Sequence, residues 1–462
     1  MAGCGLYAAL VVDTKGTDNR KAFIVKLTPY WWDQMQMAPD EVVHEDTQLP
    51  VTDVDLLVVG GGFTGLSAAL TAARLGKSVL VCDAGQMGLG ASTRNGGICS
   101  GNIRHDHGTL EKQYGREFAD GVYAEGIEAR LDLAHFCAEE KIDCHLQMTG
   151  RFTGAMTPKD YDSLARNIDA LNRIDGHEGW VVPRSEQHKE INTDRFFGGV
   201  VRAEIGGYHP GLFYEGLLQA AKRAGVLFSA YTPVISIETD AKAGKQILTE
   251  KGSVRAAQVI VATNGYTGTT RPFGQFLRRR LVPVQSCIMV TEDLGADRIR
   301  QLMPSLRMYG NTAALYCYFR PTPDRRRILL GARSFDRLTP SGRSVAYLGR
   351  KLAELFPELA DVHTDYCWLG NVAFNTSQLP RIFTHDNIWY AAGYAGSGTV
   401  WARWLGKKTA EMAFGLSNQP SRFYGEPPKA IPFYDGYPWF INAINAGYAL
   451  KDKLKAVLYA RS

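Results

Sequence analysis

The stretch VDLLVVGGGFTGLSAALTAARLGKSVLVCDAG, residues 54–85, decides the fold. It begins with a nearly continuous apolar run from Val54 to Val59, as expected for a parallel strand that is buried on both faces. A glycine-rich turn, an alanine-rich segment and a second apolar run that ends at Asp83 follow in order. This order predicts a strand, a helix and a strand, which is the βαβ unit of a Rossmann-like domain.

The turn between the first strand and the helix has the spacing GxGxxG. Gly60 is expected to make the tight turn, Gly62 to admit a pyrophosphate and Gly65 to let the helix pack on the sheet. The phosphates belong at the helix N-terminus, where free amides and the helix dipole favour anions. Asp83 is expected to accept the ribose hydroxyls of an adenosine. Because the chain has 48 glycines, the spacing alone is weak evidence. Its position between a buried strand and a helix favours a dinucleotide site over an ordinary βαβ turn.

A second glycine-rich stretch, GLGASTRNGG, follows the unit at residues 88–97. An FAD must extend past its pyrophosphate at this point, whereas an NAD enzyme needs no such loop. Ser92 and Thr93 are candidates to bind phosphate and ribityl hydroxyls, and Arg94 and Asn95 to bind the polar edge of the ring. The glycine pair that ends the stretch allows the backbone to approach the flavin face. The alternative is a solvated loop; we favour the flavin.

Composition limits the classes of function. With 462 residues, 45% of them hydrophobic, the chain is expected to form two or three globular domains. The net charge of +5 is small, and the basic runs at 278–280 and 325–327 are read as solvated faces, so nucleic acid is not an expected partner. The eight cysteines show no metal spacing, so we expect free thiols and no metal site. The apolar run at 6–12 is too short to span a membrane and lacks a basic front end, which makes a cytoplasmic location the expectation.

Nucleotide-type segments recur in three separated places, the last of which is a strand, a glycine turn and a helix near residues 387–415. We therefore expect an α/β fold (α+β overall) with a Rossmann-like FAD-binding domain and a discontinuous, β-rich substrate domain. The expected boundaries are an N-terminal extension at 1–28, FAD-binding segments at 29–105, 193–270 and 355–430, substrate segments at 106–192 and 271–354, and a tail at 431–462.

The blocks GGGFTGLSAAL and GASTRNGG also carry a resemblance. Together with PYWWD, YHPG, VIVATNGYTG, LFPEL and GYAGSGT, in this order, they resemble the D-amino acid oxidase superfamily of FAD-dependent amine oxidases, and within it the gamma-glutamylputrescine oxidase-type branch. The resemblance extends over nearly the whole chain after Pro29. It implies that FAD is bound by Gly60, Gly62, Phe63, Thr64, Asp83, Ala84, Gly90, Ala91, Ser92, Thr93, Arg94, Asn95, Gly96, Gly97, Val234, Ala262, Thr263, Gly265, Gly396, Ser397, Gly398 and Thr399.

The helix near Thr399 and the mode of FAD attachment need separate comment. A helix that begins near Thr399 would direct its N-terminal amides at the pyrimidine edge of the flavin, where negative charge appears on reduction. The alternative is a helix that only packs its tryptophans into the core. Ser397 stands where the branch usually has His. Relatives that attach FAD covalently use His in the segment of Arg94 and Asn95 or Cys in the segment near Gly370, and neither is present there, so we expect non-covalent FAD.

The resemblance implies oxidation of an amine CH–NH bond to an imine, which hydrolyses to an aldehyde, with oxygen or another electron acceptor. Some related oxidases place a Lys over the flavin where this chain has Ile328 and Leu329, so oxidase and dehydrogenase both stay open. Amino acid oxidases of the superfamily clamp the substrate carboxylate with an Arg in the region 368–380, and this chain has none there. We therefore expect gamma-glutamylputrescine or a related polyamine derivative as the substrate. The alternatives are a secondary-amine or N-methyl amino acid oxidase or dehydrogenase and, from another class, a flavin-containing RNA-associated protein.

The candidates for the catalytic site are His209, Tyr318, Arg320 and Trp368. His209, in YHPG, is a candidate to hold the amine or take its proton, although a lone His is more often structural. Tyr318 and Arg320 alternate with Tyr316 and are expected to share the face of a strand that overlooks the flavin. Arg320 or Arg333 is a candidate to meet a charged group at the far end of a gamma-glutamyl substrate.

Overall fold

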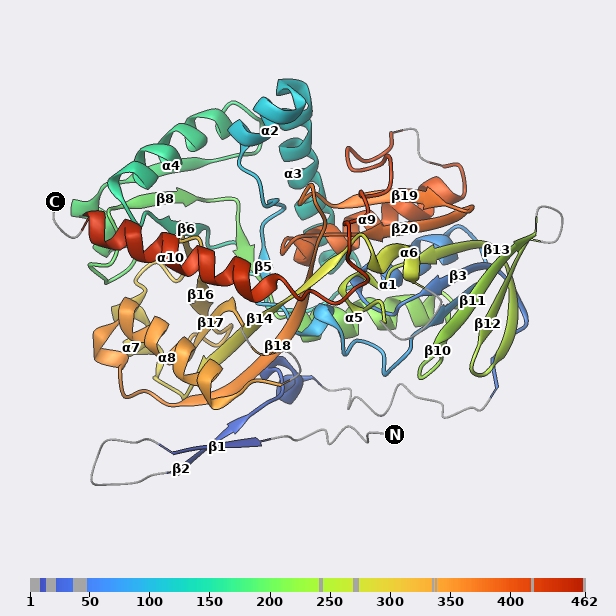
Figure 1. Cartoon of the computed structure of the whole chain (residues 1–462), viewed down its shortest axis with the longest axis horizontal. Helices are drawn as coiled ribbons and strands as arrows, with labels where there is room; N and C mark the ends of the chain where they lie inside the picture. The colour runs from blue at the N-terminus through green and yellow to red at the C-terminus, as the bar shows by residue number, and fades with distance from the viewer. Residues whose placement is uncertain are drawn as a thin grey trace.

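The computed structural model describes residues 9–13, 22–35, 48–240, 244–268, 274–334, 336, 339–416 and 419–459. These residues form two large β-sheets with helices packed around them (Figure 1). The sheet at the right of Figure 1 contains the predicted βαβ unit, and the larger sheet lies at the left.

The smaller sheet is built on the predicted unit. Strand β3 (Asp53–Val59) leads into helix α1 (Phe63–Arg74), and β4 (Val79–Cys82) returns parallel to β3. The βαβ prediction is therefore confirmed. The main path of this sheet runs in the order β10 (Leu227–Ser229), β4, β3, β13 (Gly252–Val261), β12 (Gly244–Thr249) and β11 (Val234–Asp240), and β20 (Ile388–Ala392) joins β13 and pairs with β19 (Arg381–His385).

Helices pack very closely beside this sheet. Helix α1 contacts α5 (Pro210–Arg223) and α9 (Gly398–Ala413), and α9 also contacts the long helix α3 (Arg116–Glu139). A Cβ atom on Gly65 would lie 1.9 Å from the carbonyl oxygen of Gly60, and one on Gly406 would lie 2.2 Å from that of Thr64. The lack of these side chains lets the two helices approach the nucleotide turn, as expected for Gly65.

The larger sheet crosses the other half of the molecule. Its order is β1 (Ala9–Asp13), β2 (Ala22–Lys26), β18 (Thr364–Phe374), β14 (Val282–Thr291), β17 (Ile328–Arg333), β16 (Tyr318–Pro321), β15 (Met308–Asn311), β6 (Arg151–Gly154), β8 (Gly199–Arg202) and β7 (Gly179–Val182). One face packs in an apolar cluster with α7 (Ala296–Leu302) and α8 (Gly342–Leu355). The opposite face carries a second apolar cluster, in which Ile288 and Trp368 pack with Tyr30 and Trp31.

Strand pairing cuts across the expected segments. Strands β8 and β18 both belong to the larger sheet, although their residues fall in segments that we expected to bind FAD. Strands β1 and β2 add a hairpin to the edge of that sheet from the expected N-terminal extension, whose residues 1–8 and 14–21 lie outside the described part. The domain boundaries themselves stay a prediction.

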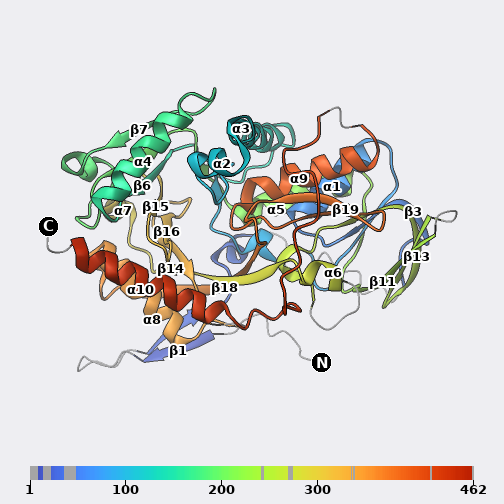
Figure 2. The same ribbon diagram turned by 45° about the horizontal axis from the view of Figure 1, so that its top comes forward.

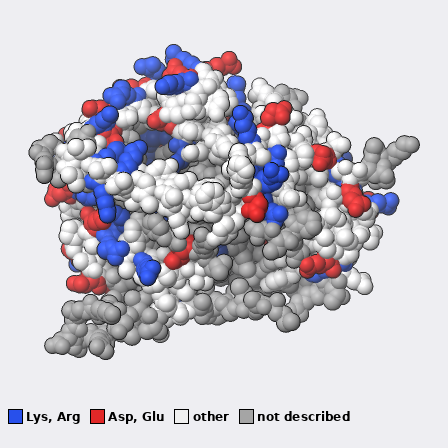
Figure 3. Space-filling view, in the orientation of Figure 1, with Lys and Arg blue, Asp and Glu red and all other residues white. Residues whose placement is uncertain are grey.

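The chain ends in helix α10 (Ile441–Tyr459), which lies along the larger sheet rather than on the nucleotide-binding half (Figures 1 and 2). Helix α4 (Pro158–Leu171) packs on β7 and β8, and α2 (His107–Tyr114) packs against α3 and α4. The short strands β5 (Ile98–Cys99) and β9 (Gly206–Gly207) pair with each other, and the short helix α6 (Gln275–Arg278) precedes β14. Positive and negative side chains are interspersed over the face seen in Figure 3.

Three further observations concern the described residues. Their seven cysteines are all free and buried, as expected from the sequence. They contain no cluster of His, Cys, Asp and Glu suited to a metal ion. Among them, no helix has the length and apolar character needed to cross a membrane.

Candidate functional site

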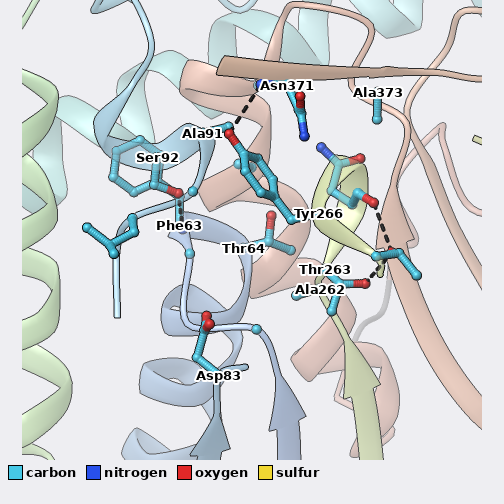
Figure 4. Close-up of a pocket in the computed structure, with 18 of the residues that line it drawn as sticks. Phe63, Thr64, Asp83, Ala91, Ser92, Ala262, Thr263, Tyr266, Asn371 and Ala373 are labelled. Carbon is cyan, nitrogen blue, oxygen red and sulfur yellow. Dashed lines mark hydrogen bonds between the residues drawn. The ribbon is translucent and has the colours of Figure 1, made fainter. Parts of the chain in front are cut away.

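A cavity of 560 Å³ lies between the glycine turn of α1, the loop 88–97 and the end of β18 (Figure 4). Its volume is in the range of cofactor and small-molecule sites. The lining includes many of the residues predicted to bind FAD: Gly60, Gly62, Phe63, Thr64, Asp83, Ala84, Gly90, Ala91, Ser92, Asn95, Val234, Ala262, Thr263, Gly396, Gly398 and Thr399. Thr93, Arg94, Gly96, Gly97, Gly265 and Ser397 are not part of this lining.

The first helix N-terminus at the cavity belongs to α1. Gly60 has a φ of +105°, which a side chain would rarely adopt, and Gly62 caps the helix without a side-chain hydrogen bond. The amide of Phe63 donates to Ser92 Oγ over 2.8 Å, and a Cβ atom on Gly62 would lie 2.9 Å from that oxygen. The remaining amides of the first turn lack intrahelical partners, so they suit a pyrophosphate.

Asp83 lies at the end of β4, at the opposite edge of the glycine turn (Figure 4). Its carboxylate accepts the amides of Gly61 at 2.8 Å and Gly85 at 3.0 Å. Burial raises the pKa of this carboxyl, while the two amides oppose that rise. A carboxylate has about four acceptor sites, so acceptor capacity remains for ribose hydroxyls. The position fits the predicted adenosine contact.

A second helix N-terminus reaches the cavity from α9. Gly396 has a φ of +97° just before the helix, and Ser397 caps it without a side-chain hydrogen bond. Gly398 and Thr399 line the cavity with the first turn of the helix. The Thr399 hydroxyl donates to the carbonyl of Ile98 over 2.5 Å, which ties this turn to the strand after the loop 88–97. Two helix N-termini whose own N-cap residues make no side-chain hydrogen bond thus meet at one cavity, where their amides can face anionic groups.

The polar side chains of the loop 88–97 serve mainly to shape the loop. Thr93 Oγ1 donates to the Gly88 carbonyl at 2.6 Å and accepts the indole N–H of Trp32 at 2.9 Å. Asn95 Nδ2 donates to the Ser92 carbonyl, and its Oδ1 accepts the amide of Gly97, both at 2.8 Å. These groups of Thr93 and Asn95 are therefore engaged in hydrogen bonds within the protein, although Asn95 also lines the cavity. Their contact with the cofactor stays a prediction. Ser92 is different, because its hydroxyl accepts one amide and keeps its hydrogen for a ligand.

Arg94 links the loop 88–97 to the larger sheet through hydrogen bonds. Its side chain donates to the carbonyls of Leu89 at 2.7 Å and Leu369 at 3.2 Å, and its guanidinium lies 4.7 Å from the centre of the Trp32 ring. The backbone carbonyl of Arg94 accepts the indole N–H of Trp368 at 2.9 Å. Arg94 was expected at the polar edge of the flavin ring. These hydrogen bonds and the ring contact instead hold the loop against β18.

Three of the four catalytic candidates are buried and do not line the cavity. A side chain that touches substrate needs accessible surface, but Trp368 and His209 are 0% exposed and Arg320 is 1% exposed. Arg320 donates to the carbonyls of Gly97 at 2.6 Å and Tyr208 at 3.0 Å, so it fixes the end of the loop. Direct substrate contact by these three side chains does not fit this arrangement. Alternation along a strand predicts a shared face but not its burial.

His209 caps a helix. Its Nδ1 accepts the amide of Leu212 at 3.0 Å at the start of α5, and its Nε2 lies 3.0 Å from Gln34 Oε1. Burial lowers the pKa of His209 to about 3, and the charges of His145 and Arg320 act in the same direction. The ring is therefore neutral near pH 7, with both nitrogens engaged.

Tyr318 remains a candidate for the substrate side. It is half-buried. A Cβ atom on Gly96 would lie 2.6 Å from its ring, and a Cβ atom on Gly331 would lie 2.2 Å from it. The ring therefore covers the glycine that we expected beside the flavin face. Tyr316 is outside strand β16, but its ring stacks near Tyr318 with 6.1 Å between centres.

Sequence reasoning missed the residues that close the cavity from above. Tyr266 and Asn371 both line it, and the amide of Asn371 donates to the Tyr266 hydroxyl at 3.1 Å (Figure 4). Asn371 Nδ2 also donates to the Gly265 carbonyl at 3.1 Å. These bonds join the turn after β13 to β18 and so link the two sheets. Tyr266, in the NGYTG motif, was the sequence feature from which this contact could have been predicted.

Known proteins with similar sequences are amine and amino acid oxidoreductases. Gamma-glutamylputrescine oxidoreductase of Escherichia coli (strain K12) is 30% identical over 402 residues, which cover 87% of this chain and 93% of that protein. Glycine oxidase of Bacillus licheniformis is 25% identical over 371 residues, covering 78% of this chain and 93% of that protein.

Solved structures share the fold. Glycine oxidase from Geobacillus kaustophilus superposes with a TM-score of 0.66 at 20% identity, covering 83% of this chain and 99% of that one. L-proline dehydrogenase from P. horikoshii gives a TM-score of 0.65 at 18% identity, covering 85% and 99%. The family model described as DAO, FAD dependent oxidoreductase, matches residues 55–412. This chain is therefore an amine-oxidising flavoenzyme and a member of the DAO family of FAD dependent oxidoreductases.

Proposed function

We propose that the protein uses non-covalently bound FAD to oxidise an amine whose reacting carbon carries no carboxylate. The substrate is gamma-glutamylputrescine or a related polyamine derivative, and the imine product hydrolyses to an aldehyde. The relative from Escherichia coli supports this substrate class, since its name states the same amine. The electron acceptor in the proposal is oxygen.

One observation carries the substrate class. Neither β18, Thr364–Phe374, nor the described lining of the cavity contains a Lys, an Arg or a His. A carboxylate on the reacting carbon would therefore be desolvated here without a cationic partner, which is costly. The competing class, N-methyl and other α-amino acids, needs such a partner.

The chain supplies position and a dry surface for this chemistry. FAD, when bound, accepts a hydride from the carbon next to the amine nitrogen. The N-termini of α1 and α9 provide amides for its phosphates and for its pyrimidine edge. Burial raises the pKa of Tyr318, so this hydroxyl stays protonated and contributes a wall rather than a base. Asp83 is the only ionisable carboxylate in the described lining, and it lies at the adenosine end. The amine must therefore arrive in its neutral form.

Non-covalent attachment has support in the surroundings of the two positions that carry covalent links in relatives. Arg94 and Asn95 occupy the first, and both side chains are engaged in shaping the loop. Near the second, Cys367 is fully buried, and its sulfur lies 3.4 Å from that of Cys287. Acid precipitation of the purified protein should release the yellow chromophore into the supernatant.

Turnover with gamma-glutamylputrescine tests the reaction and the acceptor together. We expect an aldehyde that a carbonyl-reactive hydrazine traps, with one O2 molecule consumed for each aldehyde formed. Aldehyde formation only with an artificial dye would replace oxygen by another acceptor. Turnover of sarcosine or glycine in place of polyamine derivatives would contradict the proposed substrate class.

A further inference from the structure

Arg333 is a cation on the flavin-side face of the larger sheet that the proposed reaction does not use. In the register of the sheet, Gly370 of β18 pairs with Ser286 of β14, and Ser286 pairs with Arg333 of β17. Paired residues point to one face of a sheet. A Cβ atom on Gly370 would lie 3.4 Å from Cβ of Arg94, so this face meets the loop 88–97.

The neighbours along the strands agree with this placement. Val372 and Gly370 alternate on β18, and Val372 lines the cavity. On β17, Gly331 is two residues before Arg333 and faces the ring of Tyr318. Arg333 therefore shares a face with a wall of the cavity and with the one catalytic candidate that keeps open surface.

The guanidinium of Arg333 lacks a carboxylate partner among the residues that the structure describes. Its Nη1 donates to Asn445 Oδ1 of α10 at 3.0 Å, and it lies 5.7 Å from the ring centre of Phe374 and 5.2 Å from that of Tyr448. The nearby acid on the same helix, Asp452, instead accepts the amides of Ala314 and Leu315. An arginine held between two rings and an amide is oriented but not neutralised.

The chemistry of the Arg333 side chain selects its ligand. A guanidinium group without a carboxylate partner favours an anion, and a carboxylate matches the planar fork of Arg. Burial lowers the pKa of Arg333, and the charge of Arg104 acts in the same direction.

We propose that Arg333 binds a carboxylate at the end of the substrate remote from the reacting carbon. This inference rests on the proposed function, because it names where the charged end of such an amine lies. Strand β17 is two strand spacings, about 10 Å, from β18, which carries the cavity wall. An α-amino acid has its carboxylate one bond from the reacting carbon and cannot reach both places. A gamma-glutamyl amide separates the two groups by nine bonds, or roughly 11 Å when extended.

The main test compares two amines on the flavin-loaded enzyme. Gamma-glutamylputrescine has the remote carboxylate, and N-acetylputrescine has the same reacting end without it. In anaerobic reduction, Arg333→Gln should raise the apparent Kd for gamma-glutamylputrescine by about tenfold or more, with the limiting reduction rate changed by less than about threefold. The apparent Kd for N-acetylputrescine should not change. Arg333→Lys, which keeps the charge but not the fork, should lie between.

Arg326→Gln is the matched control. It removes an Arg from the turn before the same strand, where Arg326 pairs with Asp293 at the exposed surface. This variant should behave like the wild type with both amines. Equal flavin content and equal melting temperature of the variants separate the binding effect from misfolding. An unchanged Kd for gamma-glutamylputrescine in Arg333→Gln overturns the inference and leaves the proposed reaction standing.

A non-reacting ligand separates this inference from the reaction itself. Gamma-glutamyl-n-butylamide has the carboxylate but no amine at the reacting end. We expect it to perturb the absorption of oxidised flavin in the wild type and to bind at least tenfold more weakly to Arg333→Gln. Equal binding to both proteins, or no binding to the wild type, overturns the subsite. If this ligand binds as expected but no amine reduces the flavin, the reaction fails and the carboxylate site stands.

Discussion

At the scale of single residues, close backbone contacts fix the nucleotide turn. Gly65 faces the carbonyl of Gly60, and a Cβ atom there would lie 1.9 Å from that oxygen. A backbone carbonyl in a tight turn cannot move aside cheaply, so overpacking should cost about 2 kcal/mol or more. Gly65→Ala should therefore lower both the melting temperature and the FAD content of the purified protein.

Gly349 provides the matched control for this substitution. It lies in helix α8, and a Cβ atom there would meet nothing within 4 Å. Gly349→Ala should be neutral or stabilise the protein by about 0.5–1 kcal/mol, because alanine loses less conformational entropy in a helix. Equal flavin content in Gly65→Ala and Gly349→Ala would contradict the role of Gly65.

His209 should affect stability more than catalysis. His209→Asn keeps an acceptor for the amide of Leu212 and removes the titrating ring. The folded pKa of about 3 is below that of an unfolded His, near 6.5, so the unfolded state binds the extra proton between these values. Stability of the wild type is therefore lost as pH falls from about 6.5 toward 3.

The variant should lose less stability than the wild type between pH 7 and pH 5, as measured by melting temperature. Its limiting rate of flavin reduction should stay within about threefold of the wild type. A loss of that rate by a factor of a hundred or more, with normal flavin content, would restore His209 as a catalytic residue.

At this scale, the sequence predicted the residues of the nucleotide turn more reliably than it predicted which strand side chains are buried. Asp83 and the glycines of the turn were predictable because strand, turn and helix dictate their positions. Arg320 was predicted to lie at the substrate, since alternation assigns a face to a strand residue, and Trp368 was predicted there as an aromatic wall. Alternation does not show that the loop 88–97 seals that face, which depends on contacts between residues far apart in sequence.

At the scale of elements, the N-termini of α1 and α9 are brought together by their own packing. Gly406 of α9 lies against the backbone of Thr64 in α1, and the Tyr394 hydroxyl lies 2.7 Å from Thr64 Oγ1. The glycine turns before both helices were readable from sequence. Their meeting at one cavity was inferred from resemblance, because nothing local links segments more than 300 residues apart.

Helix α10 was expected only as a tail, and partly buried hydrogen bonds hold it in position. Asp452 accepts the amides of Ala314 at 2.8 Å and Leu315 at 2.9 Å. Asp452→Asn removes the charge and one good acceptor, which should cost about 1.5–3 kcal/mol locally. The C-terminal helix should then be cleaved faster by trypsin in limited proteolysis, while FAD content stays normal. Lys453→Gln, at an exposed position of the same helix, is the control.

At the scale of the whole molecule, the cavity joins the two sheets. Tyr266 and Asn371 connect them above it, and the loop 88–97 connects them below through Arg94. A ligand held between two sheets stabilises the folded state in proportion to its binding free energy. Removal of FAD should therefore lower the melting temperature, and added FAD should restore it in a concentration-dependent way.

The pH dependence of the reaction also belongs to the whole site. The described lining has no base near the substrate end, and His209 is neutral above about pH 3. Flavin reduction at low substrate concentration should rise with pH as the substrate amine loses its proton, toward the pKa of an alkylamine near 10. A bell-shaped profile with an ascending limb near pH 6.5 would instead indicate a titrating His in the reaction.

The central claim is that this cavity holds FAD and presents it to a polyamine derivative. Its most direct test is an anaerobic titration of the purified protein with gamma-glutamylputrescine, putrescine, sarcosine and pipecolate, followed at the oxidised flavin band. We predict that the polyamine derivative bleaches the band and that sarcosine and pipecolate do not. Bleaching by the amino acids alone would contradict the substrate class, and a colourless protein that takes up no FAD would contradict the site itself.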